Sequence, residues 1–215
     1  MLRSVRDHVE FLRQYRHRFQ TTGAIAPSSR FLARAMTRPF ERHSGPARIL
    51  EIGPGTGAVT QRIVRLLKPH DQLDLVELNE KFVDVLRHKF ASNPAYQRVA
   101  DRARLHQCPI QEFEAQAPYD YIISGLPLNN FPPDLVREIF QVYFRLLAPG
   151  GVLSYFEYMY MRPLRRMVSN AAGRRRLQEL EGVLQEQLQK HRIRRDWVFV
   201  NAPPAWVQHL QAPRT

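Results

Sequence analysis

The chain has 215 residues, enough for one globular domain, and 44% of them are hydrophobic, which suffices for a core. Its single cysteine, Cys108, excludes internal disulfides and cysteine-based zinc sites, and the histidines show no ligand spacing, so we expect no metal. The net charge is +12. No apolar run approaches the roughly 20 residues of a membrane-spanning helix, so we expect a cytoplasmic protein that is peripherally associated with the inner face of the cell membrane.

The positive charge is concentrated in two flanks. Residues 1–48 hold ten arginines against three acids, and residues 162–195 hold ten basic residues against three acids. The middle, residues 49–161, carries eleven basic and thirteen acidic residues. Basic flanks indicate a polyanionic partner, either nucleic acid or an anionic bilayer, and charge alone does not choose between them.

The N-terminal 20 residues predict an amphipathic helix, with Tyr15 on its apolar face. Such a helix either packs on the domain or lies in a membrane interface. Residues 21–30 predict a loop into a second helix, capped by Ser28 or Ser29. The exposed amides of this loop, together with Arg30, could receive a phosphate or a carboxylate.

Residues 49–57 read as a short apolar strand that ends in three glycines at spacing two, Gly53, Gly55 and Gly57. The next segment, 58–67, reads as a helix. Glycines without Cβ atoms let a ligand lie against bare backbone at a positive helix N-terminus. This strand, turn and helix therefore predict a site for a nucleotide-like ligand, either a dinucleotide or S-adenosylmethionine.

Two acids favour S-adenosylmethionine. Glu51 precedes the first glycine by two positions, where it could face the cationic amino-acid end of that ligand. Glu77 ends the next apolar run, twenty residues after Gly57, where a carboxylate can accept hydrogen bonds from ribose hydroxyls. In addition, the third glycine falls one residue too early for the dinucleotide pattern G-x-G-x-x-G.

Strands and helices then alternate as a parallel α/β sheet requires. The predicted strands are 49–52, 73–77, 104–107, 119–124, 152–158, 197–201 and 205–210. The predicted helices are 58–67, 80–90, 111–115, 134–147, ended by Pro149-Gly150-Gly151, and 163–191, interrupted near Gly173. Binding and chemistry belong at the carboxyl ends of the parallel strands.

The fourth of these strands runs into a loop, residues 124–132, that contains two prolines and one glycine. We expect a rigid, extended loop whose backbone carbonyls have no strand partner and suit an amine nucleophile. The residues expected to orient the amine are Ser124, Gly125, Leu126 and Pro127, with Ser124 also beside the cofactor.

With these pieces assembled, the chain resembles the bacterial soluble phospholipid N-methyltransferases, which methylate phosphatidylethanolamine. The matching pieces are residues 22–30, 51–57, 76–79, 124–132 and 201–207. The resemblance implies a Rossmann-like class I methyltransferase with a seven-stranded, mostly parallel sheet and a reversed last strand. It also implies N-terminal amphipathic helices, so we divide the chain into a membrane-binding or lid segment, 1–48, and a methyltransferase domain, 49–215.

The resemblance also assigns further contacts to the cofactor. Thr56 belongs to the glycine motif, and Leu78 follows Glu77 in the second motif. Where the family often offers a small residue and an acid to the adenine amine, this chain has Cys108 and Ile110, which we expect to contact adenine through backbone and packing.

Ribosomal RNA adenine dimethyltransferases resemble the chain too, but their Asn-Leu-Pro-Tyr motif holds an extruded base with the asparagine and the aromatic ring. Gly125 and Leu128 occupy those two positions here. We therefore expect a lipid substrate and an anionic membrane surface as partners, and no nucleic acid. Three alternatives stay open: ornithine lipid, with a similar amine, as the substrate; methylation of ribosomal RNA adenine; and a non-catalytic module that coats membranes.

For lipid methylation the amine must lose a proton, because an alkylammonium has a pKa of about 10. Candidates to begin a proton path are Tyr15, Glu157 and Tyr158. Aromatic faces that could stabilise the methylated cation are Phe131, Tyr155, Tyr158 and Tyr160, with Tyr158 preferred. Cations that could hold the lipid phosphate are Arg30, Arg162 and Arg165.

Overall fold

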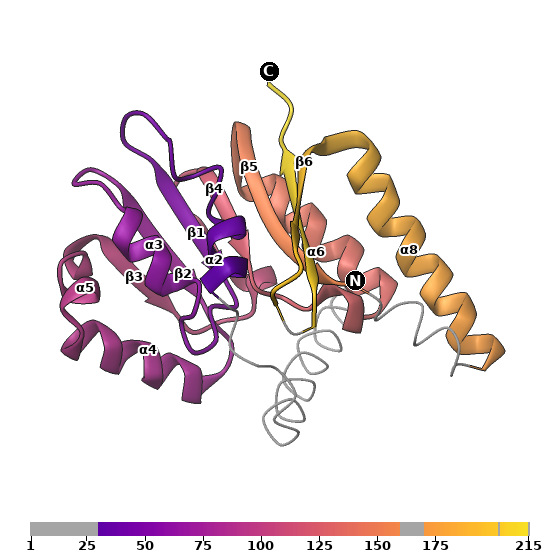
Figure 1. Ribbon diagram of the computed structural model, residues 1–215, viewed down its shortest axis with the longest axis horizontal. Helices are drawn as coiled ribbons and strands as arrows, with labels where there is room; N and C mark the ends of the chain where they lie inside the picture. Colours follow the sequence, from indigo (N-terminus) through magenta and orange to yellow (C-terminus); the bar gives the residue numbers. More distant parts are fainter. Residues whose placement is uncertain (1–29, 160–169, 202, 215) are drawn as a thin grey trace.

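The computed structural model describes residues 30–159, 170–201 and 203–214. At its centre lies a seven-stranded sheet in the order β3-β2-β1-β4-β5-β7-β6 (Figure 1). The strands are β1 (Arg48–Ile52), β2 (Gln72–Val76), β3 (Ala103–His106), β4 (Tyr119–Ser124), β5 (Leu147–Tyr158), β6 (Arg192–Val198) and β7 (Ala205–Gln211). Strand β7 runs antiparallel to both of its neighbours, β5 and β6, whereas all other pairs of neighbouring strands in this sheet are parallel. The predicted α/β fold with a reversed last strand is confirmed.

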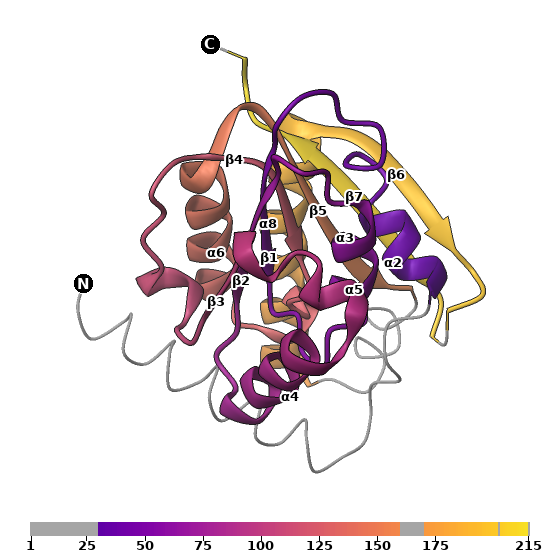
Figure 2. The same cartoon turned by 90° about the vertical axis from the view of Figure 1, so that its left-hand side faces the viewer.

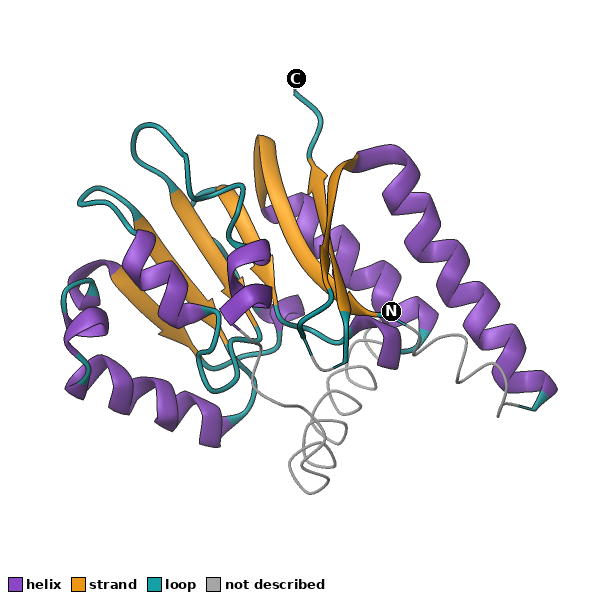
Figure 3. Cartoon of the chain, in the orientation of Figure 1, coloured by secondary structure: helices purple, strands orange, loops and turns teal. Residues whose placement is uncertain are grey.

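Helices cover both faces of the sheet (Figures 2 and 3). They are α2 (Arg30–Met36), α3 (Thr60–Leu66), α4 (Glu80–Ser92), α5 (Pro94–Gln97), α6 (Pro133–Leu146) and α8 (Ala171–His191). Buried side chains of α6 and α8 form one core with one face of the sheet, and those of α2, α3 and α5 form a second core with the other face. Every helix among the described residues is too short or too polar to cross a bilayer.

The central strands are apolar on both faces because helices cover both. In β1, Ile49 points into the core beneath α3, whereas Leu50 and Ile52 point into the core beneath α6. The strand runs parallel to both β2 and β4, so the carboxyl ends of all three meet at one edge. That edge is where the expected binding residues follow.

One prediction around β5 is wrong. Pro149-Gly150-Gly151 lies inside β5, not between a helix and a strand, because α6 already ends at Leu146. The strand register shifts between Tyr119 and Tyr121, opposite these residues. Gly151 is required there because a Cβ atom would come within 2.9 Å of the Tyr119 carbonyl oxygen.

Two C-terminal predictions are also corrected. Helix α8 passes through Gly173 without a break and begins after Asn170, whose side chain accepts a hydrogen bond from the Gly173 amide. Strand β6 spans Arg192–Val198, not 197–201. It is an edge strand, so its exposed arginines cost little, and an apolar pattern therefore does not mark where it starts.

The second predicted helix, α2, packs against β5, β6 and β7. Its side chains Leu32, Ala33 and Met36 are buried in the same core as α3. Helix α2 thus covers the sheet directly. The predicted helix 1–20 and the predicted caps Ser28 and Ser29 lie outside the described residues, so the division at residue 48 stays a prediction.

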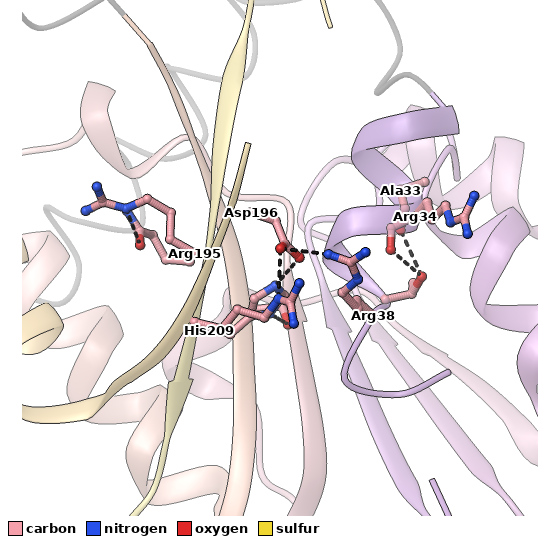
Figure 4. A network of polar contacts seen from close by, with 10 residues as sticks. Ala33, Arg34, Arg38, Arg195, Asp196 and His209 are labelled. Atoms are coloured by element: carbon pink, nitrogen blue, oxygen red, sulfur yellow. Dashed lines mark hydrogen bonds and ion pairs between the residues drawn. The ribbon is translucent and has the colours of Figure 1, made fainter. Parts of the chain in front are cut away.

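A polar network joins α2 to the C-terminal strands (Figure 4). The Asp196 carboxylate accepts hydrogen bonds from Arg38 Nη1 and Arg194 Nε, each at 2.8 Å, and lies 3.3 Å from His209 Nε2. His209 Nδ1 in turn pairs with Ser154 Oγ at 2.8 Å. Burial lowers the pKa of His209, although Asp196 opposes that shift. Burial by itself raises the pKa of Asp196, but Arg194, Arg38 and His209 bring it below its ordinary value.

We expect Asp196→Asn to lower the free energy of unfolding at pH 7 by about 1–3 kcal/mol, because it weakens two charge-assisted hydrogen bonds whose arginines are half exposed. The depressed pKa means that the contribution of Asp196 is present above its ordinary value of 3.8 and is lost as pH falls through the folded value. Denaturant unfolding of wild type and Asp196→Asn should show a difference in the free energy of unfolding that closes below pH 4. A difference that persists at low pH would contradict this account.

Candidate active site

The glycine turn follows β1 at the carboxyl edge of the sheet. Gly53, Gly55 and Gly57 all have positive φ angles, of 68°, 59° and 84°. A Cβ atom on Gly57 would come within 3.0 Å of Leu86 and of the Tyr96 hydroxyl, whereas one on Gly55 would meet nothing within 4 Å. The turn therefore packs on one side and leaves open space beside Gly55 on the other.

Glu77 links the end of β2 to this turn. Its buried carboxylate accepts a hydrogen bond from the Gly55 amide at 3.0 Å with Oε2 and from the Asn79 amide at 2.8 Å with Oε1. Each carboxylate oxygen can accept more than one hydrogen bond. Glu77 can thus fix the turn and still accept from the hydroxyls of a ligand beside Gly55, as predicted for a ribose.

Glu51 is buried beneath the start of α3. Burial raises the pKa of its carboxyl to about 8, and the side chain and backbone of Thr60 act in the opposite direction. Among the described residues Glu51 Oε2 has no hydrogen-bond partner. A neutral carboxyl with a spare oxygen is a group that a cation would ionise and pair with. This fits the cationic end of S-adenosylmethionine.

We therefore expect cofactor binding at pH 7 to release close to one proton per site, since a neighbouring cation lowers the raised pKa of Glu51. Affinity should rise with pH up to about 8 and then level off, because above that value the free protein is already ionised. Titration calorimetry in buffers of different ionisation enthalpy measures the released proton. In Glu51→Gln the release should vanish, and release that survives this substitution would contradict the assignment.

An apolar cleft lies beside the glycine turn, between the ends of β1 and β2 and the segment after β3. It is lined by Ile52, Gly53, Val76, Leu78, Cys108, Pro109, Ile110 and Leu126. The structure thus brings together the residues predicted to contact adenine, and their apolar side chains suit a flat aromatic ring. Burial raises the pKa of the Cys108 thiol, with a smaller contribution from Glu112, so the thiol stays neutral at pH 7.

The loop after β4 differs from the predicted extended form. Residues Leu128–Asn130 form a 3₁₀ turn, in which Leu126 and Pro127 carbonyls accept hydrogen bonds from Leu128 and Asn130 amides. Each of these two carbonyls thus has one partner in the turn, and the expectation that Leu126 and Pro127 help to hold the amine stays a prediction. The carbonyls of Ser124 and Gly125 take no part in this turn.

Ser124 and Gly125 are held by their neighbours. The buried Ser124 hydroxyl lies 2.6 Å from the Tyr143 hydroxyl of α6 and accepts from the Leu126 amide. The Gly125 amide donates to the Ile52 carbonyl at 2.7 Å. A Cβ atom on Gly125 would come within 2.5 Å of the Gly53 carbonyl oxygen. Only glycine allows the β4 loop to approach the glycine turn this closely.

The aromatic residues predicted to stabilise the methylated cation differ in how deeply they are buried. Phe131 and Tyr155 are buried in the core with α6, so neither presents a face to a substrate. Tyr158, at the end of β5, is partly exposed and packs against Phe156 at 5.1 Å between ring centroids. Burial raises its pKa, so its hydroxyl stays neutral at physiological pH. Glu157 is buried and accepts from Gln208 Nε2 at 3.4 Å.

A second cleft, which the sequence did not suggest, lies on the other side of the glycine turn. Four cationic side chains line it, together with Thr56 and Gly57: Arg30, Arg62, Arg65 and Lys89. Lys89 Nζ also donates to the Thr56 carbonyl at 2.7 Å. The three-residue spacing of Arg62 and Arg65 on the outer face of α3 was the available signal. Arg30, predicted to bind an anion, thus lies beside cofactor-motif residues.

The other predicted site residues lie outside the described part of the chain. They are Tyr15, Ser28, Ser29, Tyr160, Arg162 and Arg165.

The sequence of the chain is similar to those of known methyltransferases. A model described as a methyltransferase domain matches residues 49–151. An ornithine lipid N-methyltransferase of Singulisphaera acidiphila is 32% identical over 169 residues, which cover 75% of this chain and 85% of that protein. Ribosomal RNA small subunit methyltransferase A of Marinobacter nauticus is 27% identical over 128 residues, 58% of this chain and only 40% of that protein.

Among solved structures, an O-methyltransferase from Bacillus cereus in complex with S-adenosylhomocysteine has the same fold. Its TM-score is 0.62 at 16% identity, over 95% of this chain and 90% of that one. The glycine turn, the two buried acids and the apolar cleft fit the same cofactor. The chain therefore belongs to the class I S-adenosylmethionine-dependent methyltransferases.

Proposed function

We propose that this protein methylates the head-group amine of a membrane lipid, with ornithine lipid as the first candidate. The observation that carries the proposal is the 32% identity to an ornithine lipid N-methyltransferase across 85% of that protein's length. The likeness to the ribosomal RNA enzyme covers less than half of that protein. This choice changes the order expected from the sequence motifs, which favoured phosphatidylethanolamine over ornithine lipid.

The close approach of Gly125 to Gly53 supports a lipid over an RNA base. In the RNA enzymes an asparagine occupies the position of Gly125, and here any side chain would collide with the Gly53 carbonyl. Leu128, at the position of their aromatic residue, is 1% exposed and packs in the core with α6. Neither group that would hold an extruded base is available in this backbone.

Phosphatidylethanolamine remains the second candidate. The loop at residues 124–132 and the segment at 201–207 carry the motifs that resemble the phospholipid enzymes. In the second of these, the buried Asn201 side chain donates to the Pro203 carbonyl at 2.8 Å and so shapes the turn before β7. Both lipids offer a primary amine, but one pairs it with a carboxylate and the other with a phosphate.

S-adenosylmethionine supplies an activated methyl group, so the protein's own residues chiefly position and desolvate the amine. In this proposal the carbonyls of Ser124 and Gly125 accept hydrogen bonds from the amine and aim its lone pair. The neutral Tyr158 hydroxyl can relay the departing proton towards solvent, and its ring can stabilise the methylated cation by roughly 0.5–2 kcal/mol. Arg30, on the basic cleft, is a candidate for the lipid's anionic group.

The test supplies labelled S-adenosylmethionine to three acceptors in parallel: anionic vesicles with ornithine lipid, the same vesicles with phosphatidylethanolamine, and ribosomal RNA. We expect label in ornithine lipid above phosphatidylethanolamine. Label mainly in phosphatidylethanolamine would keep the lipid reaction and reverse the order of the two candidates. Label only in RNA would overturn the proposal.

A further inference from the structure

An apolar surface lies exposed where β6 turns into β7. Its members are Trp197, Phe199 and Val200, which are 55%, 64% and 66% exposed. The rings of Trp197 and Phe199 stack at 5.6 Å between centroids with an interplanar angle of 23°, and Trp197 meets Trp206 edge-on at 5.7 Å. We call Trp197, Phe199 and Val200, together with Trp206, the hairpin tip. Soluble surfaces rarely gather large aromatic side chains in this way, and such patches mark interaction sites.

The hairpin tip lies at the same edge of the sheet as the site. Tyr158, the last residue of β5, pairs with Ala205, the first of β7, and Val198 of β6 pairs with Ala205 from the other side. The Met159 amide also donates to the Pro204 carbonyl at 2.8 Å. In Figure 1 the turn and the carboxyl ends of the parallel strands lie together at the lower side of the sheet, and in Figure 2 the turn protrudes to the right.

Positive charge lies along β6 behind the tip, towards the other end of the strand. Strand β6 carries Arg192, Arg194 and Arg195, and Arg38, two residues after the end of α2, pairs with Asp196 of the same strand. The Arg195 guanidinium lies over the Trp206 ring at 5.3 Å from its centroid. Tryptophan and phenylalanine beside arginine form the combination that settles at the boundary between lipid head groups and acyl chains.

We propose that the hairpin tip docks the protein on an anionic lipid bilayer by inserting Trp197, Phe199 and Val200 among the acyl chains while the arginines of β6 meet the head groups. A second copy of this chain is a poorer occupant, because the arginines of two β6 edges would repel each other. The inference deepens the proposed function and rests on it, since docking here would bring lipid amines towards Gly125 and Tyr158.

The two tryptophans of the chain, Trp197 and Trp206, both belong to the tip, so fluorescence reports on it directly. In a Trp206→Phe variant, Trp197 alone emits. Anionic vesicles should shift its emission to the blue, and lipids brominated on their acyl chains should quench it. Unchanged Trp197 emission on vesicles that bind the protein would overturn the inference. A blue shift that occurs without vesicles when the protein concentration is raised would indicate self-association through the tip and would also overturn the inference.

A second variant measures the contribution of the tip to affinity. Replacing both Phe199 and Val200 by serine should weaken binding to anionic vesicles roughly tenfold or more, since two apolar side chains no longer leave water. Val85→Ser, at an exposed apolar residue of α4, is the matched control and should bind as wild type. Equal vesicle affinity of the double variant and wild type would contradict the inference.

Two readouts separate this inference from the proposed function. S-adenosylmethionine binding by the double variant should be unchanged, which shows that it is folded. Its methylation of lipid dispersed in detergent should also stay near wild type, because no bilayer is then needed. If wild type docks through the tip but methylates no lipid, the proposed function fails and the docking surface stands. If the wild type methylates vesicle lipid while Trp197 stays exposed to water, the docking inference fails and the proposed function stands.

Discussion

Glu77→Ala is expected to weaken S-adenosylmethionine binding roughly 100-fold or more. The substitution removes the acceptor of the Gly55 and Asn79 amides, and hydrogen bonds to a charged group contribute about 1.5–3 kcal/mol each. It also removes the group predicted to hold the ribose hydroxyls. The glycine turn would keep only the hydrogen bond from the Gly53 amide to the Val76 carbonyl as its tie to the end of β2, so the site would lose shape as well as contacts. Titration calorimetry measures the affinity.

The matched control for this variant is Glu80→Ala. Glu80 lies three residues further on, is exposed, and begins α4. The Glu80→Ala substitution changes the net charge by the same amount as Glu77→Ala. A cofactor affinity of Glu80→Ala close to wild type would therefore show that the loss of affinity in Glu77→Ala is local. An affinity in Glu77→Ala within a few-fold of wild type would contradict the role given to this carboxylate.

Gly125→Ala is expected to reduce cofactor affinity at least tenfold and to lower the free energy of unfolding by about 1–3 kcal/mol. The new Cβ atom would meet the Gly53 carbonyl oxygen at 2.5 Å and the Ile52 carbonyl oxygen at 3.5 Å, and both belong to backbone that cannot rotate away. The glycine turn must move, and the 2.7 Å hydrogen bond from Gly125 to Ile52 must lengthen. Calorimetry and denaturant unfolding follow the two effects.

Gly182→Ala serves as the control for the glycine variant. Gly182 lies inside α8, and an added Cβ atom would meet nothing within 4 Å. Alanine should therefore stabilise the helix by about 0.5–1 kcal/mol and leave cofactor binding unchanged. Wild-type affinity in Gly125→Ala would mean that the β4 loop does not depend on its close approach to Gly53.

The fold could be predicted from the sequence where strands are buried on both faces. The apolar runs of β1 and β4 gave bounds within one residue of those observed, and the alternation with helices gave the sheet. The edge strand β6 could not be located in this way, because its arginines face solvent. Pro149-Gly150-Gly151 reads as a turn, and only the contact of Gly151 with β4 explains why β5 continues through it.

The candidate site could be predicted in part for a similar reason. Glycine spacing and the position of Glu77 locate the turn, because local backbone geometry requires them. The burial of Glu51 under Thr60 depends on how α3 packs, which no local pattern reveals. Phe131 looked available in sequence but is buried against α6. The basic cleft assembles from α2, α3 and α4, so it appears only when the helices come together.

The measurement that most directly tests lipid N-methylation is the position of the transferred methyl group. Ornithine lipid vesicles, protein and S-adenosylmethionine with a deuterated methyl group would be incubated, and the extracted lipid fragmented in a mass spectrometer. The account predicts that the deuterated methyl groups lie on the head-group amine and survive mild alkali. Label on the carboxylate, lost in alkali as a methyl ester, or label found in RNA and absent from lipid, would contradict it.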